Sequence, residues 1–127
     1  MHKNPICWWE FASSDGDKTA KFLNDVFDWG LECVADSRIH ETNYEGECSS
    51  GLRGGGAFTL LNPELDPHFT MYVAVDDVDE MAKKVVEAGG TIYHGPIEVP
   101  GTTTRICLIR EPAAGMIIGM VNKKRTA

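Results

Sequence analysis

The chain has 127 residues, of which 43% are hydrophobic and 24% charged, so it can bury a core and has an ordinary globular composition. Its formal net charge of -7 argues against nucleic-acid binding, which needs clustered lysine and arginine side chains. The sequence has neither a run of eighteen apolar residues nor the apolar stretch of a signal peptide. We therefore expect one cytoplasmic domain over residues 1–127, with no membrane span.

The first half of the chain predicts a strand, a helix and three further strands. Residues 6–11 are rich in aromatic and β-branched side chains, which favour a strand. Ser14 and Asp17 resemble a capping box and predict a helix start. One face of this helix is expected to gather the apolar residues Ala20, Phe22, Leu23, Val26 and Phe27. The three later strands are expected at 31–35, 40–44 and 57–61.

The second half repeats this order with a clearer helix signal. Residues 68–75 predict a strand, and Asp77 with Glu80 predicts the N-cap of a helix that ends at Gly89. The apolar positions of this helix follow the helical period and are Val78, Met81, Ala82 and Val85. Strands are expected afterwards at 91–94, 104–110 and 116–121.

The two halves define two modules of the form βαβββ. Residues 62–67 contain two prolines and predict a linker, so module one spans about 5–61 and module two 68–122. Residues 45–56 are too glycine-rich for an interior strand and predict a mobile loop or, alternatively, a lid over a ligand. The predicted fold class is therefore α+β.

The four cysteines are widely separated and form no C-x-x-C pair. Such spacing suggests neither a zinc knuckle nor a redox dithiol. Cys7 and Cys107 lie in apolar runs and are predicted to be small core residues, whereas Cys48 is expected to be exposed.

Several short motifs, taken in order, carry a family resemblance over nearly the whole chain. They are residues 20–29, 75–79, 89–90, 99–101 and 111–115. Together they resemble the vicinal oxygen chelate superfamily of glyoxalases, bleomycin-resistance proteins and extradiol dioxygenases. Departures from its pattern are Leu23, Asp28 and Glu111. The resemblance implies two tandem modules that form a curved mixed sheet enclosing a cavity, and a homodimer.

The resemblance also implies positions for a metal site. Counting along the matched motifs places three of the family's four ligand positions at Trp8, Thr70 and Gly119. The fourth is expected within 57–61, which contains no His, Asp or Glu. None of these is a normal metal ligand. We therefore predict that the usual metal site is lost and that the protein has no cofactor, with a divalent metal as the alternative.

Strand alternation adds further residues to the same faces, because residues two apart in a strand point the same way. Glu10 therefore shares a face with Trp8, while His68 and Tyr72 share the face of Thr70. A displaced metal site built from Glu10 and His68 is an alternative, but it has no obvious third ligand.

Trp8 and Glu10 are the most informative candidates. Trp8 would offer an indole face to a ligand or belong to the core, while Trp9 points the other way, under a helix or towards a dimer surface. Glu10 would act as a general base, hold a cationic ligand, or be a solvated carboxylate. Arg105 would hold a carboxylate or be exposed, and His94 is expected in a turn.

Two functions of different classes follow from these residues. The first is a metal-free protein that binds a small molecule in the cavity through Trp8, Glu10, Thr70, Tyr72, Arg105 and Gly119. The second is an enzyme, a lyase, isomerase or dioxygenase of the glyoxalase superfamily, which uses metal with non-standard ligands or Glu10 as the catalytic base. A third hypothesis is an interaction module with an empty cavity.

Overall fold

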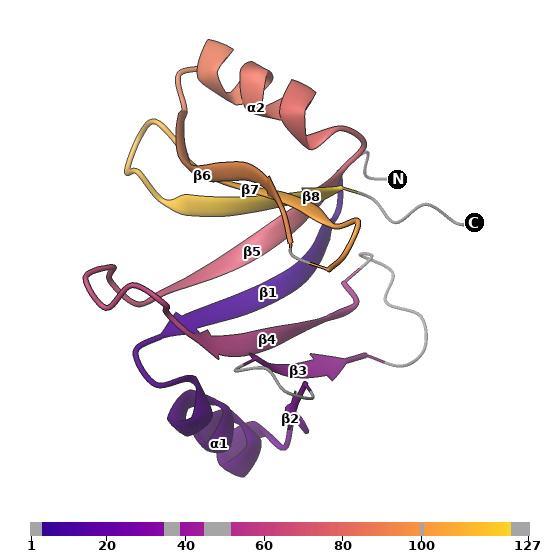
Figure 1. Cartoon of the computed structure of the whole chain (residues 1–127), viewed down its shortest axis with the longest axis vertical. Coiled ribbons are helices and arrows are strands. Elements are labelled where there is room, and N and C mark those ends of the chain that lie inside the picture. Colours follow the sequence, from indigo (N-terminus) through magenta and orange to yellow (C-terminus); the bar gives the residue numbers. More distant parts are fainter. Residues whose placement is uncertain (1–3, 35–38, 45–51, 100, 123–127) are drawn as a thin grey trace. The chain divides into compact units, whose positions relative to one another are not determined.

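The computed structural model describes residues 4–34, 39–44, 52–99 and 101–122, and its element order confirms the repeated βαβββ pattern (Figure 1). Module one contains β1 (Ile6–Ser13), α1 (Gly16–Phe27), β2 (Glu32–Cys33), β3 (Ile39–Asn43) and β4 (Gly54–Thr59). Module two contains β5 (His68–Val75), α2 (Val78–Glu87), β6 (Thr91–Glu98), β7 (Arg105–Arg110) and β8 (Ile117–Asn122). The chain forms two compact units, one of residues 7–71 and one of residues 1–6 with 72–127.

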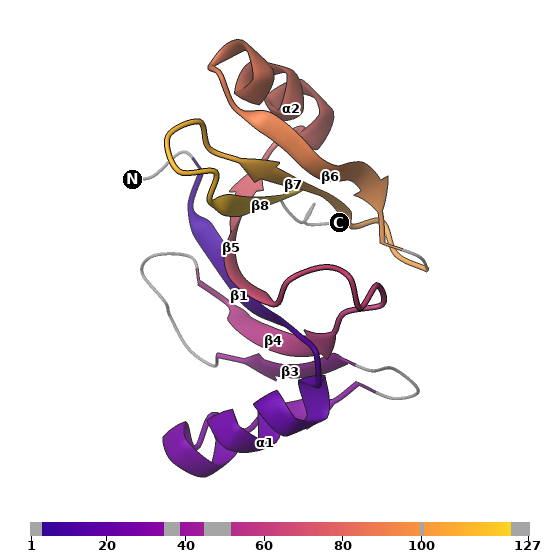
Figure 2. The same ribbon diagram turned by 90° about the vertical axis from the view of Figure 1, so that its left-hand side faces the viewer.

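Each module contributes one helix and four strands of a mixed sheet, which confirms the α+β class. In module one the strand order is β2-β3-β4-β1, and β1 is parallel to β4 while the other pairs are antiparallel. In module two the order is β5-β8-β7-β6, and β5 is parallel to β8. Figures 1 and 2 show α1 beside β3 and β4, and α2 beside the strands of its own module.

Helix α1 begins one residue later than the sequence pattern predicted. The side chain of Asp15, not Ser14, accepts the hydrogen bond from the backbone N–H of Lys18, at 3.1 Å. Asp15 is therefore the N-cap, and a carboxylate at this place also interacts favourably with the helix dipole. In α2 the predicted cap is confirmed, because Asp77 accepts from the N–H of Glu80 at 3.1 Å.

The predicted apolar face of α1 is wrong for three of its five residues. Ala20 and Leu23 are buried, but Phe22, Val26 and Phe27 are 59%, 56% and 53% exposed. Helical geometry accounts for Phe22 and Val26, which lie about 160° and about 120° around the axis from Ala20 at about 100° per residue. Phe27, the last residue of the helix, lies only about 20° from Ala20, and its ring stacks on Trp29. In α2, Val78 and Ala82 are buried, and Met81 and Val85 pack against the same cluster, as predicted.

The core of module one is built around Trp9. Its ring packs with Ala20 and Leu23 of α1, with Leu31, and with Ala57 of β4. Its indole Nε1 donates a hydrogen bond of 2.8 Å to the hydroxyl of Tyr44, which satisfies the only polar atom of the buried side chain. The prediction that Trp9 lies under a helix is therefore confirmed.

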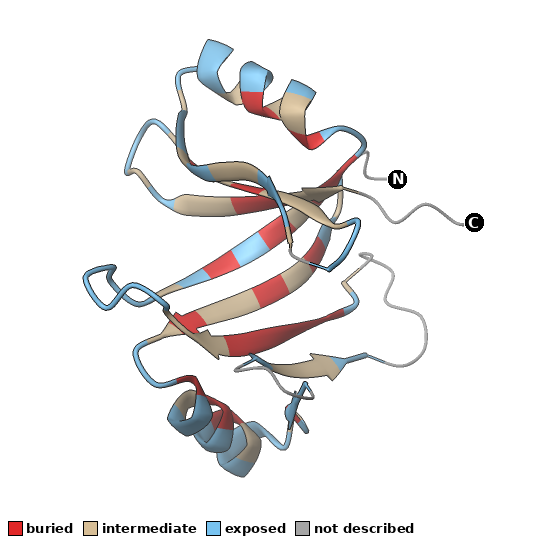
Figure 3. Cartoon of the chain, viewed as in Figure 1, coloured by how far each residue is buried: buried red, intermediate tan, exposed pale blue. Residues whose placement is uncertain are grey.

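The glycine-rich segment before residue 57 is partly a strand, which corrects the loop predicted at 45–56. Gly54, Gly55 and Gly56 are buried residues of β4, the strand that Figure 3 shows as largely buried. The physical reason is space, because a Cβ on Gly55 would overlap the ring of Trp9. Glycine, although weak in strands, is thus required where a ring packs on the backbone. Residues 45–51 lie outside the described part of the chain.

The core of module two is formed by α2 and the helix side of its sheet. Cys107 is fully buried there, in a cluster with Val75, Val78 and Met120. Cys7, in β1, is 4% exposed. Their burial confirms that both are core residues, and it also raises the pKa of both thiols, which keeps them protonated. Cys48 lies outside the described residues.

Strand β6 continues beyond its predicted end at residue 94. It runs to Glu98, with register shifts against β7 on either side of His94. Pro96 is tolerated in this edge strand because it falls within the register shift between His94 and Ile97, where it has no register partner in β7. His94 is consequently an exposed strand residue opposite Leu108, not the turn residue expected.

Neither described helix has the length and apolar character needed to cross a membrane. Helix α1 has 12 residues and α2 has 10, whereas a spanning helix needs about 20.

Candidate functional site

Each sheet has one face against its helix, and we call the other side its distal face. In module one, Trp9 and Phe11 of β1 pack in the cluster under α1. Because side chains alternate along a strand, Trp8 and Glu10 lie on the distal face, both half-buried. Trp8 and Glu10 were predicted to share one face, and the packing of Trp9 and Phe11 under α1 is consistent with this prediction.

Around Gly56 the distal face of module one brings together an indole and two carboxylates. Glu10 of β1 and Glu41 of β3 are both register partners of Gly56 in β4. A Cβ built on Gly56 would lie 3.5 Å from Cγ of Glu41 and 3.8 Å from Cζ2 of Trp8. The side chains of Trp8, Glu10 and Glu41 therefore surround a stretch of buried backbone that carries no side chain of its own.

The acidic row continues to the edge of this sheet. Glu32 of β2 is the register partner of Glu41, so carboxylates stand on β1, β3 and β2 at one level of the sheet. Adjacent like charges repel each other, and this row makes the distal face of module one electronegative. Sequence reasoning missed Glu41, because only the pairing of β3 with β4 shows that it is a neighbour of Glu10.

The distal face of module two carries an aromatic ring over a glycine. Val73 and Val75 pack against the α2 cluster, so Tyr72 points to the distal side. Tyr72 is the register partner of Gly119, and a Cβ on Gly119 would lie 2.6 Å from Cδ2 of the tyrosine ring. Tyr72 is only 6% exposed. Thr70, which alternates with Tyr72 along β5, is 3% exposed.

The first strands of the two modules correspond when the helix N-caps, Asp15 and Asp77, are superposed in sequence, so that Trp8 matches Thr70 and Glu10 matches Tyr72. Gly56 and Gly119 correspond through strand pairing, because they are the register partners of Glu10 and Tyr72. The fourth family position was predicted within 57–61, whereas strand pairing makes Gly56, which lies outside that segment, the counterpart of Gly119. The four positions carry an indole, a hydroxyl and two glycines.

This set of side chains does not fit a divalent metal ion. A metal site needs several N, O or S ligands that converge at about 2 Å. Indole and glycine offer none, and among the described residues no group of three or more His, Cys, Asp or Glu side chains is placed to hold an ion. The displaced alternative, Glu10 with His68, accordingly gains no third ligand among the described residues.

Arg105 lies away from these distal groups. Its Nε and Nη2 donate hydrogen bonds of 2.6 and 2.8 Å to the two carboxylate oxygens of Asp79 in α2, on the helix side of module two. Those bonds lower the pKa of Asp79 and raise the pKa of Arg105. The guanidinium thus has an internal carboxylate partner, and we do not include Arg105 in the candidate site.

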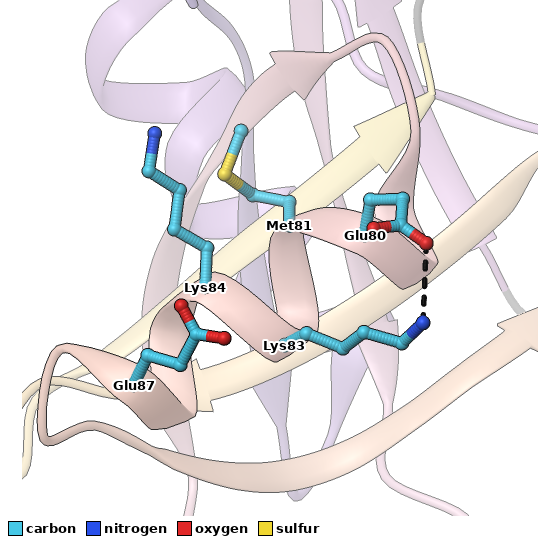
Figure 4. A pocket seen from close by; sticks show the side chains of 5 residues that line it. All are labelled: Glu80, Met81, Lys83, Lys84 and Glu87. Carbon is cyan, nitrogen blue, oxygen red and sulfur yellow. Dashed lines mark hydrogen bonds and ion pairs between the residues drawn. The ribbon is translucent and has the colours of Figure 1, made fainter.

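A shallow depression on the outer side of α2 is not a convincing site. It is lined by Glu80, Met81, Lys83, Lys84 and Glu87 (Figure 4). Its two lysines and two glutamates balance in charge. The ammonium of Lys83 already donates a hydrogen bond of 3.1 Å to the carboxylate of Glu80. Four of its five side chains are exposed, as is usual for the solvent face of a helix.

No family model matches the chain, but three curated proteins do. A Mycobacterium bovis protein provisionally named glyoxylase CFP32 is 26% identical over 125 residues, covering 93% of this chain and 45% of that protein. The anthracycline biosynthesis protein DnrV of Streptomyces peucetius is 26% identical over 118 residues, covering 84% of this chain and 42% of that protein. The chain thus spans about half the length of these relatives.

Solved structures of similar fold cover nearly the whole chain. Methylmalonyl-CoA epimerase from Mycobacterium tuberculosis matches with a TM-score of 0.60 and 18% identity, over 95% of this chain and 89% of that one. The Streptomyces coelicolor epimerase in complex with 2-nitronate-propionyl-CoA has a TM-score of 0.62 and 15% identity, over 98% and 100% of the two chains. A glyoxalase/bleomycin resistance protein/dioxygenase superfamily member from Vibrio splendidus has a TM-score of 0.62 and 13% identity, over 94% and 99%.

Proposed function

Because the chain is a member of the vicinal oxygen chelate superfamily, we propose that it binds a small molecule on the distal face of module one, without a metal ion at the family's usual positions. The observation that carries this proposal is the arrangement around Gly56. There an indole and two carboxylates, from Trp8, Glu10 and Glu41, surround backbone that lacks a side chain.

The chemistry of these three groups favours a small organic cation with an apolar part. An indole face attracts cations and packs against flat apolar groups. Carboxylates on both sides of Gly56 would pair with an ammonium group, and the net charge of -7 would raise the local concentration of cations. Thr70, Tyr72 and Gly119 remain proposed ligand-binding positions, as counterparts of the same groups.

Ligand class is tested by quenching of tryptophan fluorescence. The probes are organic amines, neutral aromatic compounds of the same size, and CoA thioesters such as the ones that a neighbouring epimerase binds. An anthracycline belongs in the panel because one relative is named for anthracycline biosynthesis. We expect amines to bind best, and equal binding of amines and neutral compounds would contradict the proposal.

Residue roles are tested with matched variants of the same protein. Glu10→Gln and Glu41→Gln should each weaken amine binding by about tenfold, which corresponds to about 1.4 kcal/mol. Glu87→Gln, an exposed change on α2, is the control for net charge and should leave binding unchanged. If Glu87→Gln weakens binding as much as Glu10→Gln, long-range charge rather than this site explains the affinity.

Metal analysis tests the second half of the proposal. The protein is purified without chelator from cells grown with Ni, Zn, Fe and Mn salts, and its metal content is measured by mass spectrometry. We expect well under one ion per chain. A stoichiometric ion would overturn the metal-free proposal.

One observation favours an enzyme as the second candidate function. Glu10 and Glu41 stand on opposite sides of Gly56, roughly 10 Å apart if two strand spacings separate them, so either could take a proton from a ligand lying across β4. Under this alternative Glu10 is the catalytic base of an isomerase-type reaction. Deuterium exchange into an acidic C–H bond of a CoA thioester, monitored by NMR, would detect this activity, and Glu10→Gln should abolish it.

A cytoplasmic location and a homodimer also stay proposals.

A further inference from the structure

An imidazole and a carboxylate are hydrogen-bonded near the edge of the sheet in module one. Nε2 of His40, in β3, lies 2.6 Å from Oδ1 of Asp17, in the first turn of α1. The imidazole side chain is only 16% exposed, whereas the carboxylate side chain is 84% exposed. His40 is the register partner of Ala57, a core residue under α1, so it points to the helix side of the sheet. The pair therefore lies on the opposite side of the sheet from Trp8 and Glu10.

The hydrogen bond determines which ring nitrogen of His40 can act as a base. An ionised carboxylate only accepts hydrogen bonds, so the hydrogen at this contact belongs to Nε2. In the neutral imidazole Nδ1 then carries a lone pair. An imidazole whose other nitrogen is held by a carboxylate is the arrangement of a general base with its orienting group. Asp17 is thus a positioning residue for Nδ1 of His40.

A thiol stands beside this imidazole on the neighbouring strand. Cys33 of β2 is the register partner of His40, so the two side chains lie on the same side of the sheet. The N–H of Val34 bonds the carbonyl of Ile39 at 2.8 Å, which makes those two a hydrogen-bonded pair of the antiparallel ladder. Cys33 and His40 form the next pair, which is of the non-hydrogen-bonded kind. Side chains are closest in such pairs, with Cβ atoms roughly 4.5–5.5 Å apart. The imidazole is therefore within reach of the thiol.

The thiol is accessible to solvent and can turn towards the imidazole. Cys33 is exposed, and β2 is the edge strand of its sheet (Figure 1). Its Sγ donates a hydrogen bond of 3.6 Å to the carbonyl of Val34, and a thiol is a weak donor. Because one torsion angle sets the position of this sulfur, a change of rotamer moves it towards the ring of His40. A small molecule in solution can thus meet the sulfur and the imidazole together.

Module two shows that the fold does not require an ionisable base at this place. There Asp79, which corresponds to Asp17, accepts two hydrogen bonds from the guanidinium of Arg105. An arginine stays charged at every physiological pH and cannot serve as a base. A permanent cation is therefore sufficient to connect the first turn of the helix with the sheet. The imidazole of His40 and the thiol beside it need a separate explanation.

We propose that Cys33 is a site of covalent modification by small disulfides, with His40 as its base. Nδ1 of His40 removes the thiol proton, and the sulfur then attacks one sulfur of the disulfide. The new S–S bond forms as the old one breaks, so Cys33 is oxidised to a mixed disulfide and the other half of the reagent leaves as a thiolate. The imidazolium returns its proton to that thiolate, and a neutral thiol is released. This proposal does not rest on the proposed ligand site, which lies on the distal face.

Mass spectrometry of the intact protein measures the rate of this reaction. A Cys48→Ser protein is incubated with hydroxyethyl disulfide, an uncharged aliphatic reagent, and proteolysis locates the mixed disulfide at Cys33. We expect His40→Gln to slow its formation at neutral pH by at least about tenfold. His94→Gln, an exposed change in module two, is the matched control and should leave the rate unchanged. Circular dichroism establishes that each variant folds.

The pH dependence separates a base from a structural role. At alkaline pH hydroxide ionises thiols without help, so the ratio of the rate with His40 to the rate with His40→Gln should fall as the pH rises. A ratio that is the same at every pH would mean that His40 only shapes the surface around Cys33, and it would overturn the proposal. Equal rates of the two proteins at neutral pH would overturn it as well.

Asp17→Ala tests the positioning role of the carboxylate. Without its acceptor the imidazole is no longer held with Nδ1 as the basic nitrogen, so the reaction should slow several-fold at neutral pH and less at alkaline pH. Asp25→Ala is the control, because it removes an exposed carboxylate from the same helix and should leave the rate unchanged. If both variants slow the reaction equally, the charge of the helix and not the orientation of His40 controls the thiol.

Discussion

The ring of Trp9 lies directly on the backbone of Gly55, its register partner in the parallel strand β4, so closely that a Cβ at Gly55 would overlap the indole. Trp9 is 5% exposed, and its Nε1 bonds the Tyr44 hydroxyl. The ring therefore has little freedom to move away. Gly55 thus determines how closely β4 and the indole pack under α1.

Gly55→Ala should destabilise the protein by about 1–3 kcal/mol, because the added methyl group forces the indole or the strand to shift in a packed core. Chemical denaturation of the purified variant measures this cost. A double-mutant cycle identifies the cause, since Gly55→Ala should cost much less when Trp9→Leu has already removed the ring. An equal cost in both backgrounds would mean that strand conformation, not the indole, demands glycine.

The N-cap of α1 gives a second comparison between neighbouring residues. Asp15→Ala should lower the free energy of unfolding by about 1 kcal/mol, because the backbone N–H of Lys18 loses its acceptor. Ser14→Ala, one residue earlier and exposed, should change it by less than about 0.5 kcal/mol. If Ser14→Ala lowers the free energy of unfolding more than Asp15→Ala does, the N-cap is Ser14, the residue that the sequence pattern favoured.

Local patterns in the sequence were sufficient for the order of elements but not for the contacts between them. Residues 68–75, the Asp77 cap and the burial of Cys107 each follow from a few neighbouring residues, and all are confirmed. The strand at Gly54–Gly56 could not be predicted, because it exists through packing with Trp9, which is distant in sequence.

The candidate site shows the same limit. Alternation along one strand was enough to place Trp8 beside Glu10 on one face. Glu41 was missed because its position beside Gly56 depends on strand pairing, and Arg105 was assigned to a ligand because its partner Asp79 lies on another element. Side-chain roles that depend on register or on helix-to-strand packing need the fold before they can be assigned.

The Asp79–Arg105 pair predicts an acid-sensitive contribution to the stability of module two. The bonds from Arg105 hold the pKa of Asp79 below its ordinary value of 3.8, so the folded state binds this proton more weakly than the unfolded state. The contribution is therefore complete above pH 3.8 and is lost as the pH falls through the lower, folded-state pKa. Asp79→Asn should destabilise the protein at neutral pH and have a smaller effect at a pH below 3.8.

Asp25→Asn is the control for that experiment, because Asp25 pairs with Lys21 at the solvent-exposed surface of α1. Such pairs contribute about 0.3–0.5 kcal/mol, so this variant should change stability little at either pH. Denaturant unfolding at the two pH values measures both variants. If Asp79→Asn lowers the free energy of unfolding equally at both pH values, the pKa shift of Asp79 is not the source of its stabilising effect.

Thiol labelling tests the assignment of the cysteines and, through them, the packing of both modules. Cys7 and Cys107 are 4% and 0% exposed and their pKa values are raised by burial, so little thiolate is present and little of it is accessible. Cys33 is exposed. In a Cys48→Ser background, a disulfide reagent should therefore modify Cys33 quickly, and Cys7 and Cys107 only at the rate at which the protein opens. Adding denaturant should make all three react together, whereas fast labelling of Cys107 in the native protein would show that α2 does not seal the core of module two.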